Sequence, residues 1–200
     1  MGRTLDIASG DAAAMAALTQ ENRALWAALE ATRAQLAELE LLADTDTLGP
    51  MLNRRAFLRE LEATLQINVR HQVPAAVLFI DVNGLKAIND GYGHEAGDAV
   101  ILHIALELQA RVRVSDTVAR IGGDEFGVIL THLEEDAARS KANAMIAAVG
   151  ATSVEFSGHQ IPVGLGCGLA MVRQGDSVRS VLARADTAMY ATRRVQRSLK

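Results

Sequence analysis

Thr117-Val-Ala-Arg-Ile-Gly-Gly-Asp-Glu-Phe-Gly-Val-Ile-Leu130 sets two apolar runs on either side of a short turn of glycines and acids. We expect the two runs, Thr117–Ile121 and Phe126–Leu130, to be antiparallel strands of a hairpin. The two glycines between them are expected to take the positive φ that tight turns require. Such a hairpin would carry the acids Asp124 and Glu125 at its tip.

Outward from this hairpin, helical and strand patterns fill the chain from residue 53 onward. Predicted helices cover 53–70, 87–90, 98–111, 137–149 and 178–198, and predicted strands cover 75–81 and 163–171. Asp98 is expected to cap the helix that starts there. Strands mixed with helices, one hairpin included, predict an α/β sandwich with a mixed, mostly antiparallel central sheet.

Residues 1–43 are predicted to form a separate helical unit ahead of a domain at 44–200. Residues 12–43 contain no Pro or Gly, and spacing by seven gives two core positions. These positions hold Met15, Asn22, Leu29 and Leu36, and Leu18, Leu25, Thr32 and Leu39. The pattern favours a coiled coil that forms a homodimer, and a helix packed on its own domain is the alternative. Asp44 to Pro50 then predicts a loop.

Composition excludes several classes of protein. The net charge of −4 argues against binding nucleic acid through a broad basic face, which would have to neutralise many phosphates. The single cysteine, Cys167, excludes an internal disulfide and a multi-cysteine zinc site, and is expected to be a buried, inert thiol. We find neither a signal-peptide pattern nor an apolar run long enough for a membrane span, so a cytoplasmic protein is expected.

Acids at strand ends suit a nucleotide–metal site, because Mg²⁺ binds a few carboxylates and leaves positions for phosphates. Four blocks resemble, in order and spacing, the motifs of GGDEF-family diguanylate cyclases. They are 53–57 (Asn-Arg-Arg-Ala-Phe), 81–98 (Asp-Val-Asn-Gly-Leu-Lys-Ala-Ile-Asn-Asp-Gly-Tyr-Gly-His-Glu-Ala-Gly-Asp), 120–126 (Arg-Ile-Gly-Gly-Asp-Glu-Phe) and 185–190 (Ala-Asp-Thr-Ala-Met-Tyr). The resemblance implies a nucleotidyl-cyclase-like domain with a ferredoxin-like core.

The resemblance also implies a role for each matched position. The ligands of Mg²⁺ or Mn²⁺ would be Asp81, Asp124, Glu125 and the Val82 carbonyl, and the catalytic residues would be Asp124, Lys86 and Glu125. Phosphates would be bound by the Gly84 and Leu85 amides, Arg193 and Arg197. Guanine would be bound by Asn89 and Asp98. His94 is either a ligand contact or a residue that ties its loop together. Asp98 could serve both guanine and its helix cap.

The segment Arg113-Val-Ser-Asp116 matches the family's RxxD site, which implies inhibition by the product, cyclic di-GMP. The arginine would stack on guanine and contact phosphate, and the acid would bind the purine edge. Leu48-Gly49-Pro50-Met51 departs from the family pattern and bears on coupling between the units. Asn83, Gly84 and Leu85 also depart from it, in positions next to the expected metal ligands.

The resemblance therefore implies a diguanylate cyclase that condenses two GTP into cyclic di-GMP and two pyrophosphates, with two domains facing each other in a homodimer. Three alternatives stay open. They are a catalytically inactive domain that binds cyclic di-GMP at Arg113 and Asp116, a cyclase of other nucleotide specificity, and a coiled-coil scaffold.

Overall fold

The structure is a computed structural model that describes the backbone of residues 4–198 and the side chains of residues 15–36, 39 and 42–191. It separates into two compact units, with the boundary between Ala43 and Asp44. Helix α1 (Thr4–Asp44) confirms the predicted long helix and begins earlier than expected. Among the described residues, no helix combines the length and the apolar character needed to cross a membrane.

The second unit mixes helices and strands. Its elements are α2 (Arg54–His71), β1 (Ala75–Val82), α3 (Leu85–Tyr92), α4 (His94–Gln109), β2 (Thr117–Arg120), β3 (Glu125–Thr131), α5 (Glu135–Gly150), β4 (Ser153–Phe156), β5 (His159–Pro162), β6 (Leu165–Met171) and α6 (Val178–Ser198). All of them except β4 and β5 match elements that the sequence patterns predict. Four strands form one antiparallel sheet in the order β2-β3-β1-β6, and β4 and β5 form a separate hairpin.

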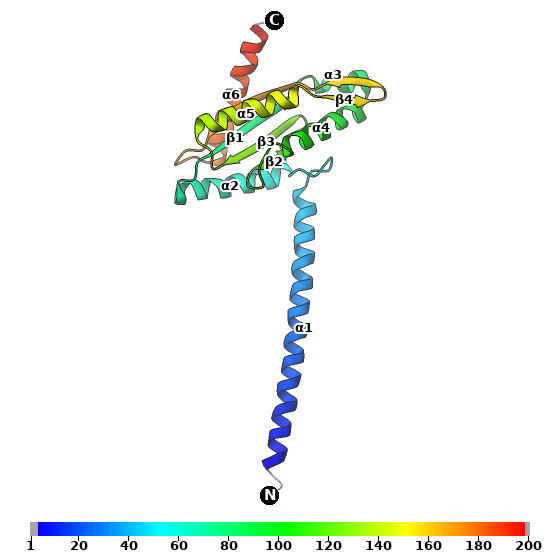
Figure 1. Cartoon of the computed structure of the whole chain (residues 1–200), viewed down its shortest axis with the longest axis vertical. Coiled ribbons are helices and arrows are strands. Elements are labelled where there is room, and N and C mark those ends of the chain that lie inside the picture. Colours follow the sequence, from blue (N-terminus) through cyan, green and yellow to red (C-terminus); the bar gives the residue numbers. More distant parts are fainter. Residues whose placement is uncertain (1–3, 199–200) are drawn as a thin grey trace. The chain divides into compact units, whose positions relative to one another are not determined.

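Helices cover both faces of the four-stranded sheet (Figure 1). The side chains of β1 alternate between the faces: Val77 packs with α2 and α6, whereas Leu78 and Ile80 pack with α4 and α5. This period of two is the geometry of a strand, and burial on both sides explains why β1 reads as a continuous apolar run. The result is the predicted α/β sandwich, in which the C-terminal end of β1 lies beside the N-terminal end of β3.

Three details differ from the sequence predictions. Helix α4 begins at His94 after Gly93, whose φ is 89°, so Asp98 lies inside the helix and the expected cap is wrong. The positive φ expected at Gly122 and Gly123 is also wrong, since neither glycine is among the residues with positive φ. The hairpin of β4 and β5 was not predicted, although its turn residues Ser157 and Gly158 are a turn signal and take φ of 49° and 79°.

The loop after α1 is attached to the edge of the sheet. Leu52 donates its N–H to the Val118 carbonyl (3.2 Å) and accepts from the Arg120 N–H (2.8 Å), so it extends the sheet beside β2. Asn53 then caps α2 by accepting from the Ala56 N–H (3.1 Å). The loop is therefore held at a fixed place next to the strand that leads into the acidic turn.

Candidate active site

Asp81 and Glu125 are direct partners in the pairing of β1 with β3. The neighbouring pair is hydrogen bonded, with the Val82 N–H donating to the Asp124 carbonyl (2.8 Å), so Asp81 and Glu125 form a pair without backbone bonds between them. Side chains of such a pair lie on one face and closest together. The structure thus brings the end of β1 and the hairpin tip to one place, as the sequence predicts.

The charges around Glu125 are mostly negative. Burial raises the pKa of Glu125, and the carboxylates of Asp124, Asp81 and Asp186 raise it further, while the Arg54 guanidinium opposes them. Arg54 also donates to the Ile121 carbonyl at the base of the turn (3.0 Å). A cation at this point would relieve the repulsion among the carboxylates.

Two of these residues had no assigned role in the sequence-based site. Arg54 and Asp186 line a cavity of about 290 Å³ with Glu125, between α2 and α6. Both belong to motifs of the resemblance, Arg54 at the start of α2 and Asp186 in α6. Their positions within those motifs were the available sign that Arg54 and Asp186 belong to the site. Only the fold shows that both residues lie beside Glu125.

The donor set suits Mg²⁺ only in combination with substrate. Among the residues that the structure describes, no three His, Cys, Asp or Glu side chains form a group that could hold a metal ion by themselves. Mg²⁺ is usually held by one or two carboxylates together with substrate phosphates. Asp81 and Glu125 fit that arrangement, with Asp124 next to them on the turn.

Helix α3 begins immediately after β1 and beside these acids. Gly84 precedes it with φ of 75°, a conformation that a side chain would strain, and the first residues of the helix are Leu85 and Lys86. Free N–H groups at a helix start attract anions, and the exposed Lys86 adds a positive charge. Two of the predicted phosphate contacts, the amides of Gly84 and Leu85, therefore lie next to the predicted metal ligands.

The predicted guanine contacts lie where α3 meets α4. The Oδ1 atom of Asn89 is the one buried side-chain polar atom without a hydrogen-bond partner within the described part of the chain. It packs on Gly97, where an added Cβ would lie 1.9 Å from it. His94 and Asp98 are exposed and four residues apart on α4, so they share one helix face. Since α4 starts at His94, capping does not occupy the Asp98 carboxylate.

The RxxD turn lies on another part of the unit, between α4 and β2. Arg113 is exposed, whereas the side chain of Asp116 is fully buried. Burial raises the pKa of Asp116, but the Lys141 ammonium and the backbone N–H groups of Arg113 and Thr131 outweigh it and hold that pKa below its usual value.

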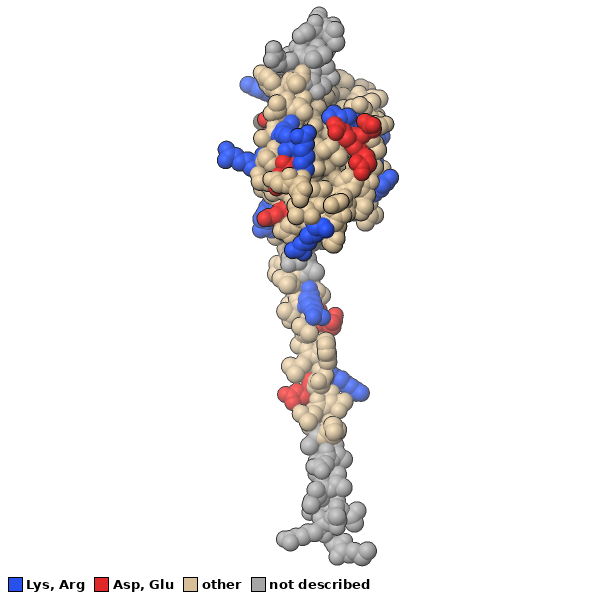
Figure 2. Space-filling view, turned by 90° about the vertical axis from the view of Figure 1, so that its left-hand side faces the viewer, with Lys and Arg blue, Asp and Glu red and all other residues tan. Residues whose placement is uncertain are grey.

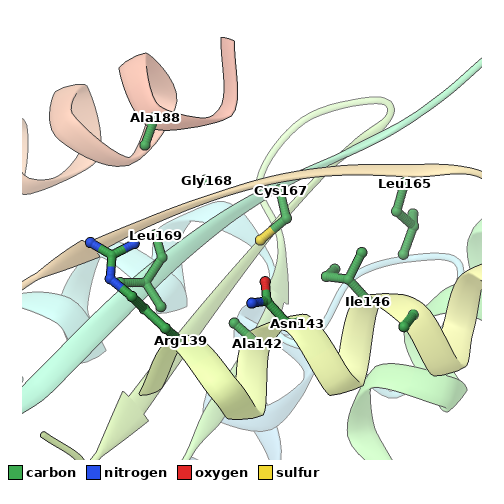
Figure 3. Close-up of a pocket in the computed structure, with 10 residues that line it drawn as sticks. Arg139, Ala142, Asn143, Ile146, Leu165, Cys167, Gly168, Leu169 and Ala188 are labelled. Atoms are coloured by element: carbon green, nitrogen blue, oxygen red, sulfur yellow. The ribbon is translucent and has the colours of Figure 1, made fainter. Parts of the chain in front are cut away.

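A separate cavity of about 340 Å³ contains none of the predicted site residues. Figure 3 shows it between α5, β6 and α6, with Cys167 pointing toward Asn143. Burial raises the pKa of the Cys167 thiol to about 12, so this thiol stays protonated. The side chains of two other predicted contacts, Arg193 and Arg197 of α6, lie outside the described residues.

Figure 2 shows how charged side chains are distributed on one face of the second unit. On this face, basic and acidic side chains of residues 44–191 lie near one another, without a broad basic surface.

Comparisons with known proteins agree with this description of the fold. The solved structure of the coiled coil and GGDEF domain of DgcB from Caulobacter crescentus, in complex with c-di-GMP, superposes with a TM-score of 0.78 at 26% identity, over 88% of this chain and 94% of that one. TpbB from Pseudomonas aeruginosa, a diguanylate cyclase, is 37% identical over 92% of this chain. DgcE from Escherichia coli, a probable diguanylate cyclase, is 36% identical over 81% of this chain.

The fold class is thus an α/β domain of the GGDEF type preceded by a helix. The model of the GGDEF domain of diguanylate cyclases matches residues 43–198, and the chain belongs to that family. It spans 44% of TpbB and 15% of DgcE, so it corresponds to a part of those longer relatives.

Proposed function

We propose that this chain is a diguanylate cyclase that converts two GTP into cyclic di-GMP and two pyrophosphates. In each of two steps a 3′-hydroxyl attacks an α-phosphorus, a P–O bond forms, pyrophosphate leaves and the hydroxyl proton passes to a base. The observation that carries the proposal is the pairing of Asp81 with Glu125 beside Asp124 and the start of α3. It gathers carboxylates for a metal ion and N–H groups for phosphates at one point.

The residues divide into groups with distinct tasks. Asp81, Asp124, Glu125 and the Val82 carbonyl would hold Mg²⁺, or Mn²⁺ in its place, which when bound would neutralise phosphate charge. Asp124 would accept the proton of the attacking hydroxyl, and Lys86 would stabilise charge that develops on the triphosphate. The Gly84 and Leu85 amides, Arg193 and Arg197 would bind phosphates.

Guanine would be selected by Asn89 and Asp98. A carboxylate accepts from both the N1–H and the exocyclic amine of guanine, and adenine lacks this pair of donors. The orphaned Asn89 Oδ1 supports this assignment, because a buried polar atom without a partner calls for an explanation. His94 lies on the same face of α4 and would contact the nucleotide.

A homodimer would bring two such sites together, because one domain holds one GTP. In the single chain, Leu25 and Leu36 of α1 are 64% and 55% exposed, and they belong to the seam of heptad positions. A second copy of α1 is the occupant that this seam fits. The superposition on DgcB, whose solved fragment includes a coiled coil, supports the same arrangement.

Cyclic di-GMP would also inhibit the enzyme by binding at Arg113 and Asp116. Because GTP is the substrate, we place the reaction in the cytoplasm.

The test is chromatography of GTP incubated with Mg²⁺ and either the wild type, Asp124→Ala or Asp136→Ala. We expect cyclic di-GMP from the wild type and from Asp136→Ala, whose aspartate lies in the first turn of α5. Asp124→Ala should lose at least about 100-fold in rate. No product from the wild type, together with binding of cyclic di-GMP, would instead identify the chain as an inactive receptor.

A further inference from the structure

Asp116 of the RxxD turn is already occupied by hydrogen bonds. Its Oδ2 atom accepts from the Arg113 N–H (3.0 Å) and from Lys141 Nζ (2.7 Å). Its Oδ1 atom accepts from the Thr131 N–H (3.0 Å). The Asp116 side chain has 0% exposure and that of Lys141 has 20%, so solvent reaches the Lys141 side chain and not the carboxylate.

A guanine edge needs one acceptor site on each carboxylate oxygen, for its N1–H and its amine. A carboxylate offers about four such sites, two on each oxygen. In Asp116, Oδ1 has one site left, but both sites of Oδ2 are taken by Arg113 and Lys141. The two-point contact with guanine therefore cannot form while all three donors stay in place.

Of these donors, Lys141 is the one that can leave. The Arg113 N–H is fixed by the turn, in which the Asp116 N–H also donates to the Arg113 carbonyl (2.9 Å). The Thr131 N–H is fixed by β3, whose last residue pairs with Ala75. Lys141 approaches from α5 on a flexible four-carbon stem and can move its ammonium into solvent.

We propose that Lys141 is a latch on the inhibitory site, whose ammonium competes with guanine for Asp116 and thereby weakens the binding of cyclic di-GMP. The proposal rests on the proposed function in taking cyclic di-GMP as the ligand. It assigns to Lys141 a role in setting the concentration of product at which the enzyme is inhibited. Arg113, exposed beside the turn, would make the first contact with the ligand.

Calorimetric titration of the full chain with cyclic di-GMP tests the latch through Lys141→Met. Loss of a positive charge alone should weaken binding of an anionic ligand, so the control is Arg139→Met on the same helix. Arg139 pairs with Glu135 (2.6 Å) and does not contact Asp116. We expect Lys141→Met to bind at least about three-fold more tightly than wild type, and Arg139→Met to bind no more tightly. Equal or weaker binding by Lys141→Met would overturn the latch.

A second measurement uses the wild type and does not depend on the fold of a variant. The chain has three lysines, Lys86, Lys141 and Lys200, so their ammonium groups can be assigned by NMR after lysine-specific labelling. Saturation with cyclic di-GMP should move the Lys141 ammonium signal to that of a solvated lysine. A Lys141 signal that keeps its ion-paired position in the saturated complex would refute the displacement.

The outcomes separate this inference from the proposed function. GTP turnover tests the enzyme by itself, and product binding is measured without turnover. If neither wild type nor Lys141→Met binds cyclic di-GMP, the inhibitory site and the latch both fail while the cyclase can stand. If both bind equally, only the latch fails.

Discussion

Arg120 connects the loop that follows α1 to the acidic turn, through Asp46. Its Nη1 lies 3.3 Å from Asp46 Oδ1, and its Nε and Nη2 donate to the Gly123 carbonyl at 3.2 and 2.7 Å. Both side chains of the ion pair are largely buried, at 17% and 16% exposure. One guanidinium therefore fixes the position of the turn relative to the loop.

This relationship predicts that Asp46→Ala lowers the turnover number by about ten-fold, equivalent to ~1.4 kcal/mol in the activation barrier. Arg120 would lose its ion-pair partner, and the turn that carries Asp124 and Glu125 would be held less firmly. Steady-state kinetics with GTP measure the effect, and Thr47→Ala, at an exposed site in the same loop, is the control. Equal rates for the two variants would show that the ion pair does not support catalysis.

Replacing each of the two turn glycines, Gly122 and Gly123, with alanine should affect activity to different extents. A Cβ on Gly122 would lie 2.3 Å from Glu125 Oε2, whereas a Cβ on Gly123 meets no atom within 4 Å. Gly122→Ala must displace the Glu125 carboxylate, so we expect activity to fall by about ten-fold or more. Gly123→Ala should keep most of it. The pair is compared by initial rates at saturating Mg²⁺, and similar losses would contradict this steric explanation.

The seam of α1 predicts an activity that depends on dilution. Leu25→Lys or Leu36→Lys would place charges in the dimer contact, so specific activity should fall steeply as the protein is diluted. Ala27→Lys, on the side of the helix away from the seam, should behave as the wild type. Rates measured from micromolar to nanomolar protein test this, and seam variants that keep full activity at nanomolar protein would argue against the coiled coil.

Gly168 of β6 lets α6 pack directly on the sheet. A Cβ there would lie 2.1 Å from the Ala185 carbonyl oxygen and 2.2 Å from the Met189 nitrogen, and both are backbone atoms that cannot rotate away. Gly168→Ala should therefore lower the free energy of unfolding by about 3 kcal/mol. Gly150→Ala, whose added Cβ meets nothing within 4 Å, is the control. Urea unfolding followed by circular dichroism measures both, and equal stabilities would contradict the close contact.

The ion pair of Asp176 with Arg184 predicts a dependence of stability on pH. Hydrogen bonds from Arg184 hold the pKa of Asp176 at about 2, below the ordinary 3.8. Because the pKa of Asp176 is lower in the folded than in the unfolded chain, its ionised carboxylate stabilises the fold above pH 3.8, and this contribution is lost as the pH falls toward 2. After allowance for solvent screening it amounts to ~1 kcal/mol. Asp176→Asn should be less stable than wild type at pH 7, and the gap in urea unfolding should narrow at pH 3. A constant gap would exclude the carboxylate as its source.

The sequence by itself determined most of the helices and strands, their order along the chain, and the family. Apolar residues at strand or helix spacing mark the elements wherever a core is buried, and the motifs around Asp81 and Asp124 have a fixed order along the chain. Short exposed elements gave weaker signals, so the hairpin of β4 and β5 was missed. Asp98 was wrongly predicted to cap α4, because a cap position and an early position inside a helix look alike in sequence.

Only the tertiary structure decided which side chains share a neighbourhood. It brought Arg54 and Asp186 to the acids Asp81, Asp124 and Glu125, and it buried Asp116 against Lys141, which is 25 residues away along the chain. Sequence reasoning gave Asp116 to the purine edge without the partners that hold it, because a motif records residue types and not the donors that folding brings to them. The physical reason is that charges and hydrogen bonds act across space, and distance in space is fixed by the packing of α5 on the sheet.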